Sequence, residues 1–316
     1  MRKYKVFIDG SEGTTGLRIN ERFAKRDDIE VLGIDPELRK DPAERKKLIN
    51  ASDYTFLCLP DVAARESVSL VENPDTVVID ASTAHRTDSG WAYGLPELSE
   101  EHRKKIRTSK RIAVPGCYAS GFVMLAYPLV SKGILPADYP FVIPAVSGYS
   151  GAGRKAIALY EADDKASDLY APRQYALTQM HKHLPEMKVI TGITREPIFI
   201  PSVDDYYCGM IVNLPIHTHL MDKKMSPEEL RDVLADHYEG QEFIRVKEYG
   251  AESETNGFLA ANCLAGADYA EIYVTGNEAR ITVMAVFDNL GKGASGAAVE
   301  CMNISMGLDA GTGLVL

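Results

Sequence analysis

The first third of the chain alternates short apolar, β-branched runs with polar segments of helical period. The apolar runs predict strands at residues 4–8, 31–34, 54–59, 77–79 and 112–114. The segments between them predict helices over residues 16–26, 41–51 and 62–72. Strands that are apolar throughout and separated by helices are typical of a parallel sheet covered on both faces. We therefore expect a doubly wound α/β domain over residues 1–118.

From about residue 119 onward the pattern changes. Loops rich in Gly, Pro and Tyr become longer, and strand-like runs that alternate apolar and polar residues follow at 189–193, 210–215, 243–246 and 280–286. Ser226, Pro227 and Glu229 have the spacing of a helix start, and this helix is expected to run to about Tyr238. Alternation with one polar face favours a mixed or antiparallel sheet with helices on one side. We therefore expect a second domain over residues 119–292.

Length and charge narrow the class of protein. The 316 residues are about twice the usual size of one domain, which favours two domains. A formal net charge of −10 argues against a nucleic-acid groove, because such a groove needs a basic face. The five cysteines include no C-x-x-C pair, so neither a disulfide framework nor a cysteine zinc site is expected. Without a signal-peptide core or an apolar run near the ~20 residues of a membrane helix, we expect a cytoplasmic protein.

A glycine-rich turn follows the first predicted strand and opens the first predicted helix. Gly10, Gly13 and Gly16 have the spacing G-x-x-G-x-x-G, a variant of the dinucleotide-binding fingerprint. Such glycines let a pyrophosphate approach the backbone, where the amides of the helix N-terminus favour negative charge. Thr14 and Thr15 would add hydroxyl donors. The alternative is a plain tight turn, but the position after the first strand of a βαβ pattern favours phosphate binding.

The end of the second predicted strand leaves the type of dinucleotide open. Asp35 lies where an acidic residue usually binds the ribose 2′-hydroxyl of NAD, and it would repel the 2′-phosphate of NADP. Arg39 and Lys40 lie just beyond and would instead pair with that phosphate. The other interpretation of Asp35 is that its side chain caps the turn at Pro36.

One cysteine falls at a predicted helix start. Cys117 follows a strand and a Pro-Gly turn, and it precedes apolar residues at helical spacing, namely Ala119, Phe122, Val123, Ala126 and Val130. The free amides and positive dipole end of an amphipathic helix favour the thiolate, which is the reactive form. The same amides would serve as an oxyanion hole. We interpret Cys117 as a nucleophile and the other four cysteines as buried apolar fillers.

A nucleophilic cysteine needs an acid or base partner. His181 and His183 are the best candidates, because Pro185 stiffens the turn after His183 and Glu186 would orient an imidazole. His217 and His219 are either half of a metal site or a solvated pair. No cluster of carboxylates or cysteines completes a metal site, so we expect the solvated pair and no metal. The remaining three, His85, His102 and His237, are expected at the surface.

Two further glycine-rich segments are candidate loops. Residues 147–155 begin with Ser147 and Gly148 and end with Arg154 and Lys155, a combination of small residues and cations that suits an anionic ligand. The alternative is a mobile loop without a ligand. Residues 288–296 contain Asn289 and open another helix, and this loop is expected to return the chain to the cofactor.

These elements match the reduction of an acyl phosphate through a cysteine thioester, and they also carry a resemblance. The chain resembles N-acetyl-gamma-glutamyl-phosphate reductase in nearly its whole length and in the right order. The matching runs are Gly13-Thr14-Thr15-Gly16, Pro115-Gly116-Cys117-Tyr118, Ser150-Gly151-Ala152-Gly153-Arg154, Pro185-Glu186 after His183, and Asp288-Asn289-Leu290. The opening Ile8-Asp9-Gly10 and the short length resemble the type 2 form of this family.

The resemblance implies a fold, an activity and a set of sites. The fold would be a Rossmann domain completed by a C-terminal helix over residues 293–316, with an α+β catalytic domain of the glyceraldehyde-3-phosphate dehydrogenase type. The activity would be NADPH-dependent reduction of N-acetyl-L-glutamyl 5-phosphate in arginine biosynthesis, by a homo-oligomer. Cys117 would form the thioester, with His183 or His181 as the acid–base group and His183 preferred. The other implied contacts are Gly10, Gly13, Thr14, Thr15 and Gly16 for the pyrophosphate, Asn289 for the nicotinamide, and Ser147, Gly148 and Arg154 for the substrate.

Three alternatives stay open from the residues alone. The chain could be an aspartate-semialdehyde dehydrogenase relative or a reductase of a carrier-bound aminoadipyl phosphate, because the side chains that select the acyl group are not identifiable. It could also be a nucleotide sensor that kept the fold without the chemistry. A thiol at a helix start beside an anion-binding loop disfavours the sensor, since a sensor has no use for it.

Overall fold

The computed structural model describes residues 3–316, which form two compact units. The first unit comprises the residues up to Gly116 together with Ala294–Val315, and the second comprises Cys117–Gly293 with Leu316. Within residues 3–316, no helix is both long and apolar enough to cross a membrane.

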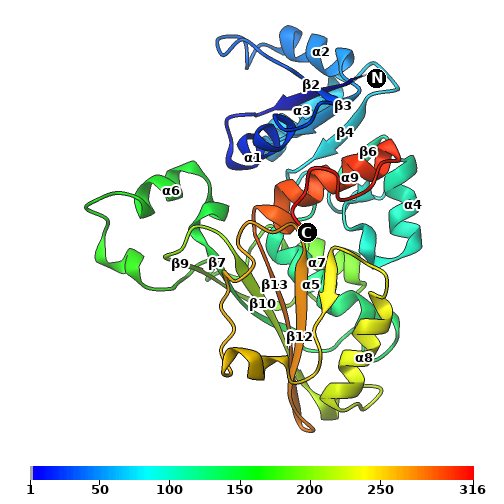
Figure 1. Ribbon diagram of the computed structural model, residues 1–316, viewed down its shortest axis with the longest axis vertical. Helices are drawn as coiled ribbons and strands as arrows, with labels where there is room; N and C mark the ends of the chain where they lie inside the picture. Colours follow the sequence, from blue (N-terminus) through cyan, green and yellow to red (C-terminus); the bar gives the residue numbers. More distant parts are fainter. Residues whose placement is uncertain (1–2) are drawn as a thin grey trace. The chain divides into compact units, whose positions relative to one another are not determined.

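The first unit is built on a six-stranded parallel sheet (Figure 1). Its strand order is β2-β1-β3-β4-β6-β5. The strands are β1 (Tyr4–Asp9), β2 (Ile29–Leu32), β3 (Tyr54–Leu57), β4 (Val77–Asp80), β5 (Ala92–Tyr93) and β6 (Arg111–Ala113). The helices are α1 (Thr14–Phe23), α2 (Pro42–Ala51), α3 (Asp61–Ser69), α4 (Glu100–Thr108) and α9 (Gly296–Met306). The doubly wound parallel sheet is confirmed, and β5 and α4 are elements that the sequence did not predict.

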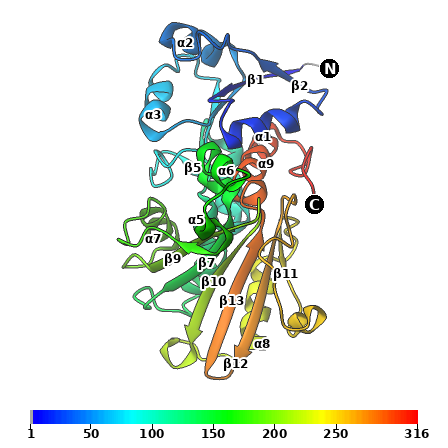
Figure 2. The ribbon, with the colours of Figure 1, turned by 90° about the vertical axis from the view of Figure 1, so that its left-hand side faces the viewer.

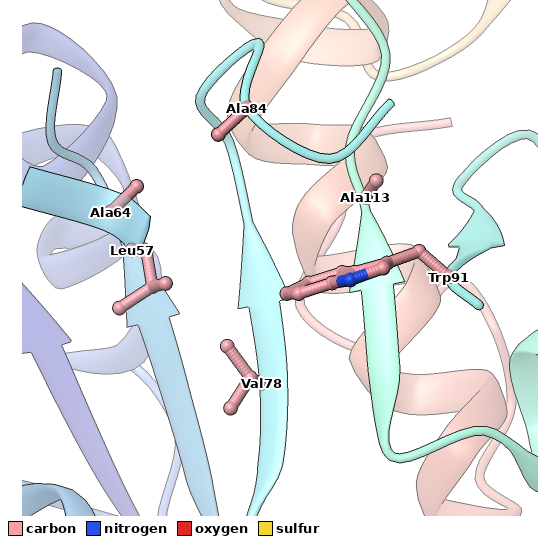
Figure 3. Packing of buried hydrophobic residues seen from close by; sticks show 6 residues of the cluster. All are labelled: Leu57, Ala64, Val78, Ala84, Trp91 and Ala113. Atoms are coloured by element: carbon pink, nitrogen blue, oxygen red, sulfur yellow. The ribbon is translucent and has the colours of Figure 1, made fainter. Parts of the chain in front are cut away.

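The core of this unit is made by the strands that the sequence predicted as apolar throughout. Leu57, Val78 and Ala113 lie on the neighbouring strands β3, β4 and β6 and pack with Ala64 of α3 and with Trp91 (Figure 3). Strand residues of this kind lie between two covered faces, which is why polar alternation is missing from the sequence.

The expectation that His85 lies at the surface is wrong. His85 is only 6% exposed, its ring stacks on Trp91 with 4.1 Å between centroids, and its Nδ1 lies 2.6 Å from the Asp80 carboxylate. Asp80 is also bonded by the backbone N–H and the hydroxyl of Ser82, both at 2.8 Å. A histidine whose apolar face and polar edge both find partners is stable in the interior.

The C-terminal helix is shorter than expected. It was predicted over residues 293–316, but α9 ends at Met306, where Gly307 adopts a left-handed φ of 73° as the helix cap. The residues that follow form turns tied to the first unit. The Asn303 side chain donates to the carbonyls of Ala310 and Thr312, and Arg26 donates to Asn303 Oδ1 at 2.6 Å.

The second unit contains a seven-stranded mixed sheet of order β11-β12-β13-β10-β7-β9-β8. Its strands are β7 (Val142–Gly148), β8 (Arg173–Gln174), β9 (Ile198–Asp204), β10 (Met210–His217), β11 (Ile244–Val246), β12 (Ala270–Asn277) and β13 (Arg280–Phe287). Its helices are α5 (Cys117–Ser131), α6 (Arg154–Tyr160), α7 (Leu184–Thr191) and α8 (Pro227–His237). The α+β architecture expected from the resemblance is confirmed. Short helical turns lie at Tyr149–Ala152, Ser167–Tyr170, Thr218–Leu220 and Ala251–Thr255. Another, Gly291–Ser295, spans the end of this unit, and a further one, Pro96–Leu98, belongs to the first unit.

The helices α5, α7 and α8 lie on one side of this sheet (Figure 1), and Figure 2 looks onto the opposite face. The predicted start of α8 is confirmed, because Ser226 and Glu229 form a reciprocal capping box. On the opposite face, the segment that includes Ala251 and Leu264 packs against Tyr273 and Val286. Farther along the sheet, one face of the paired strands β7 and β9 presents half-buried or exposed apolar residues, namely Val142, Pro144, Val146, Ile198 and Ile200.

Three predictions about this unit are wrong. Cys208 and Cys263 were expected to be buried apolar fillers, but Cys208 is half-buried and Cys263 is exposed. Residues 189–193 were predicted as a strand, but most of them lie in α7, which has Pro185 in its first turn and left-handed Gly192 at its end. The buried residues Leu184, Met187 and Thr191 recur at helical spacing along it. The helix that begins at Cys117 was predicted as amphipathic, but α5 is buried nearly all round. It is enclosed by β10 and β13 on one side and by α7 and α8 on the other.

Candidate active site

The glycine turn occupies the end of β1, as predicted. Gly10 has a left-handed φ of 89°, and a Cβ there would clash with the carbonyl oxygen of Cys58. A Cβ on Gly16 would lie 2.6 Å from the carbonyl oxygen of Gly10. Both positions therefore need glycine for space. Helix α1 begins at Thr14 directly after the turn, and Gly13, its N-cap residue, has no side chain to cover the helix start.

A pocket of about 290 Å³ lies beside this turn within the first unit. The turn lines it with Gly10 and Gly13, and the loop after β2 lines it with Arg39 and Lys40. Arg39 forms an ion pair with Glu12 of the turn. The structure thus brings the predicted pyrophosphate turn and the two predicted cations to one cavity.

Asp35 makes the contact of a turn cap. Its Oδ1 accepts the backbone N–H of Glu37 at 2.9 Å, and the neighbours Ile34 and Pro36, but not Asp35, line the pocket. An aspartate that satisfies the amide two residues on is a common device at a turn. Of the two interpretations of Asp35 from the sequence, the structure favours this one.

Cys117 is the first residue of α5, as predicted, and is half-buried. The strand end that leads to it is held by Arg86, whose Nε donates to the carbonyl of Val114 at 2.8 Å. A thiol in the first turn of a helix lies in the positive field of the backbone dipoles, which favours the thiolate. By contrast, burial raises the pKa of the Cys58 thiol to about 12, with help from the charges of Asp80 and Asp9.

The two predicted catalytic histidines lie together around Tyr118, the residue after the cysteine. The ring of Tyr118 is 6.3 Å from that of His181 and 6.2 Å from that of His183, and the two imidazoles are 4.6 Å apart. His183 is 5% exposed and forms the N-cap of α7, whereas His181 is more open. His181 Nδ1 accepts the backbone N–H of His183 at 3.2 Å, so the proton of a neutral His181 ring is on Nε2.

Two tyrosines complete this cluster, and the sequence analysis assigned neither a role. Tyr118 donates its hydroxyl to the carbonyl of Ser202 at 3.0 Å, and its ring lies 6.3 Å from that of Tyr175. Burial raises the pKa of both phenols well above the ordinary value, and the nearby charge of Cys117 adds to the rise in each. Both side chains therefore stay neutral at physiological pH and act as hydrogen-bond donors rather than bases.

The predicted anion loop begins in the last residues of β7 and continues into the short helical turn Tyr149–Ala152. Ser147 is buried, and its side chain lies within hydrogen-bond reach of Tyr118. A Cβ on Gly148 would lie 2.6 Å from the carbonyl oxygens of Tyr206 and Tyr207, so only glycine fits there. Arg154 is exposed at the start of α6. The structure thus brings Ser147 and Gly148 to the histidine cluster and leaves Arg154 at the surface of the unit.

Asn289 joins two loops of the second unit. Its Oδ1 accepts the backbone N–H of Gly209 at 2.9 Å, and its Nδ2 donates to Ser150 Oγ at 3.0 Å. The side chain is 2% exposed. Asn289 therefore holds the anion loop in place, and its contact with a nicotinamide stays a prediction.

The second histidine pair, His217 and His219, is distant in sequence from His181 and His183 and differs from them in exposure. His217 and His219 are exposed, with 5.6 Å between ring centroids. Across residues 3–316, no group of three or more His, Cys, Asp or Glu side chains is arranged to hold a metal ion.

Two protein families match the chain in sequence. Residues 5–106 match the family described as semialdehyde dehydrogenase, NAD binding domain, and residues 117–289 match the semialdehyde dehydrogenase dimerisation domain. An N-acetyl-gamma-glutamyl-phosphate reductase 2 from Nostoc sp. is 43% identical over 99% of this chain and 100% of its own length. An N-acetyl-gamma-glutamyl-phosphate reductase from Chelativorans sp. is 45% identical over 96% of this chain and 98% of its own.

Solved structures with the same fold are more distant in sequence. Aspartate semialdehyde dehydrogenase II from Vibrio cholerae, complexed with ASA, superposes with a TM-score of 0.69 at 16% identity, covering 97% of this chain and 99% of that one. The aspartate semialdehyde dehydrogenase from Francisella tularensis gives 0.72 at 15% identity, covering 95% and 99%. At these identities the likeness extends to the fold alone.

Proposed function

The chain belongs to the N-acetyl-gamma-glutamyl-phosphate reductase family, and we propose that it converts N-acetyl-L-glutamyl 5-phosphate to N-acetyl-L-glutamate 5-semialdehyde and phosphate. The reductant is NADPH, and the reaction belongs to cytoplasmic arginine biosynthesis. The observation that carries the proposal is Cys117 at the start of α5 within a family whose curated relatives, 43–45% identical over nearly their full length, bear this name.

The residues of the second unit supply a complete set of roles for acyl transfer. The Cys117 thiolate attacks the acyl carbon, and the tetrahedral oxyanion is stabilised by backbone amides at the start of α5. The C–O bond to phosphate then breaks, the electron pair leaves with the phosphate, and a thioester remains on Cys117. Once the acyl group is at the aldehyde level, His183 takes the proton from its oxygen, the C–S bond breaks, and the semialdehyde leaves as the Cys117 thiolate is restored. His181 orients His183 by accepting its backbone N–H. Ser147, Gly148 and Arg154 bind the substrate.

The first unit binds the dinucleotide. Gly10 and Gly16 let the turn close tightly, because a Cβ at either would meet the backbone of Cys58 or Gly10, and the uncovered start of α1 offers amides for the charge of a pyrophosphate. Thr14 and Thr15 add hydroxyl donors, and Arg39 and Lys40 pair with a 2′-phosphate. When bound, NADPH supplies the hydride that takes the acyl group to the aldehyde level. Asn289 is proposed as a further contact for the nicotinamide.

The assay that tests the function runs the reaction in reverse. With N-acetylglutamate semialdehyde, phosphate and NADP, we expect phosphate-dependent appearance of NADPH absorbance. Omission of phosphate should stop it, because the thioester then has no acceptor. Activity with aspartate semialdehyde and none with the N-acetylated compound would overturn the substrate and favour an aspartate-semialdehyde dehydrogenase.

The cofactor preference should depend on the two cations of the pocket. We expect Lys40→Ala and Arg39→Ala each to lower kcat/KM for NADPH about 10-fold while leaving that for NADH nearly unchanged, since each removes one charge-assisted contact. Lys47→Ala, an exposed lysine of α2 outside the pocket, is the matched control. A parallel loss with both cofactors in the pocket variants would contradict the proposed 2′-phosphate site.

We also propose that the enzyme is a homo-oligomer, a dimer or tetramer. The family that matches the second unit is described as a dimerisation domain. In this unit, one face of strands β7 and β9 presents apolar side chains to solvent, and Ile198 is 56% exposed. Burial of such apolar surface between subunits stabilises the assembly by about 25 cal/mol per Å².

Light scattering on a size-exclusion column measures the assembly directly. We expect Ile198→Glu to shift the protein toward monomer, because a carboxylate cannot be buried unpaired in an apolar interface. Val62→Glu, on an 84% exposed residue of α3, should leave the assembly unchanged. If both variants elute as the wild type does, the interface lies elsewhere.

A further inference from the structure

We infer that Gly293 is a positioning residue for the nucleophile, an inference that rests on the proposed function of Cys117. A Cβ built on Gly293 would lie 3.0 Å from Cys117 Cβ, 3.2 Å from the carbonyl oxygen of Asp288 and 3.3 Å from Phe287 Cε2. The φ of Gly293 is outside the left-handed region, so the backbone conformation does not demand glycine. Glycine is required by the close packing instead, because the backbone of Gly293 lies against Cys117 and leaves little room for a Cβ.

The segment that carries Gly293 is held too firmly to yield. It is a π-helical turn (Gly291–Ser295), a rare conformation that often occurs at functional sites. Gly291 is itself so close to the carbonyl of Ala267 that a Cβ would clash there. Lys292 is fully buried, with its ammonium 4.9 Å from the ring centroid of Phe243. These contacts fix the two residues that precede Gly293.

A single carboxylate ties the turn to the end of β13. Asp288 Oδ1 accepts the backbone N–H groups of Leu290 at 2.7 Å and Gly291 at 3.1 Å, and its Oδ2 accepts that of Gly266. The Gly293 N–H in turn donates to the Asp288 carbonyl at 3.0 Å. Because this N–H is already bonded, Gly293 acts on Cys117 by shape and not as an oxyanion donor.

Helix α5 cannot move away from an added methyl group either. It is buried nearly all round, and a Cβ on Gly121, one turn after the cysteine, would lie 2.5 Å from Val212 Cγ2. The body of the helix is therefore fixed, and the strain falls on its half-buried first residue, where the Cβ of Cys117 shifts and its sulfur moves with it. Attack on an acyl carbon depends on the position of the sulfur to within a few tenths of an ångström, so such a shift slows the reaction.

Alkylation of individual cysteines tests the position of the sulfur without any substrate. We expect Gly293→Ala to slow iodoacetamide labelling of Cys117 about threefold or more, because the thiolate is displaced from the helix-start amides. Exposed Cys263 in the same unit is the internal reference and should label at the wild-type rate. Gly90→Ala is the matched control, because its φ is also outside the left-handed region and its Cβ would lie 3.2 Å from Asp88 Oδ1, and it should leave Cys117 labelling unchanged.

Steady-state kinetics separate positioning from binding. We expect Gly293→Ala to lower kcat about 10- to 100-fold with KM within about threefold of the wild type, because substrate still binds while the sulfur is misplaced. Unchanged labelling together with unchanged kcat would overturn the inference. Slowed labelling in a chain that proves inactive on the proposed substrate would overturn the proposed function instead and leave the positioning role supported.

A thermal-stability cycle covers the case in which Gly293→Ala folds poorly. Cys117→Gly removes the Cβ that the new methyl group would meet. We expect Gly293→Ala to lower the Tm clearly less in the Cys117→Gly background than in the wild type, because the closest contact is gone. An equal loss of Tm in both backgrounds would show that the methyl group meets something other than Cys117, and the inference would fall.

Discussion

The Cys117→Ser variant is expected to lose kcat by a factor of roughly 10³ or more in both directions of the reaction. A serine hydroxyl ionises far above neutral pH. The helix start therefore favours a thiolate at this position but cannot produce the corresponding alkoxide. The substitution changes one atom of a half-buried side chain, so the fold and the dinucleotide pocket, which lies within the first unit, should be unaffected.

The measurement pairs steady-state rates with mass spectrometry of the enzyme after exposure to the acyl phosphate. Wild-type protein should gain the mass of the N-acetylglutamyl group on the Cys117 peptide, and the serine variant should gain none. Cys263→Ser, on an exposed cysteine of the same unit, controls for loss of a thiol and should retain wild-type activity. Full activity of Cys117→Ser would rule out a mechanism with a covalent thioester on Cys117.

The parts of the fold that were predictable are those fixed by short-range patterns. Each of the five strands predicted in the first third exists. Central strands such as β3 and β4 are buried at every position, and strands covered on both faces carry runs of mostly apolar residues. The start of α8 was predictable because its cap is made by residues three apart. In contrast, α7 was mistaken for a strand, because a short apolar run has no clear period of its own.

The candidate site shows the same difference between local and distant signals. The position of Cys117 at a helix start was predictable, since a Pro-Gly turn before a helix is a local signal, and its role as nucleophile stays a proposal. The joint placement of His183 and Tyr118 depends on α7 packing against α5, and the role of Gly293 depends on a turn that is distant in sequence. No local pattern reports such contacts. Tyr118 had one signal, its place beside the cysteine, whereas Tyr175 lies in a loop without any motif.

The choice between the two histidines is the second expectation with a large effect. We expect His183→Asn to lower kcat about 10²- to 10⁴-fold, the usual contribution of a general acid or base. His183 is buried, is fixed at the N-cap of α7 by the proline that follows, and lies against Tyr118. His181→Asn is the matched variant. An asparagine oxygen can still accept the His183 backbone N–H, so we expect a loss within about 10-fold.

The pH dependence of kcat/KM distinguishes a proton-transfer role from a structural one. If His183 moves the proton, the wild-type profile has a limb set by its imidazole, and His183→Asn removes that limb while His181→Asn retains it. If His183 has only a structural role, His183→Asn should lower kcat/KM at every pH and leave the shape of the pH profile unchanged. If His181→Asn loses the limb and His183→Asn keeps it, the roles are reversed: the more open imidazole then carries the proton, and the buried one only supports the start of α7.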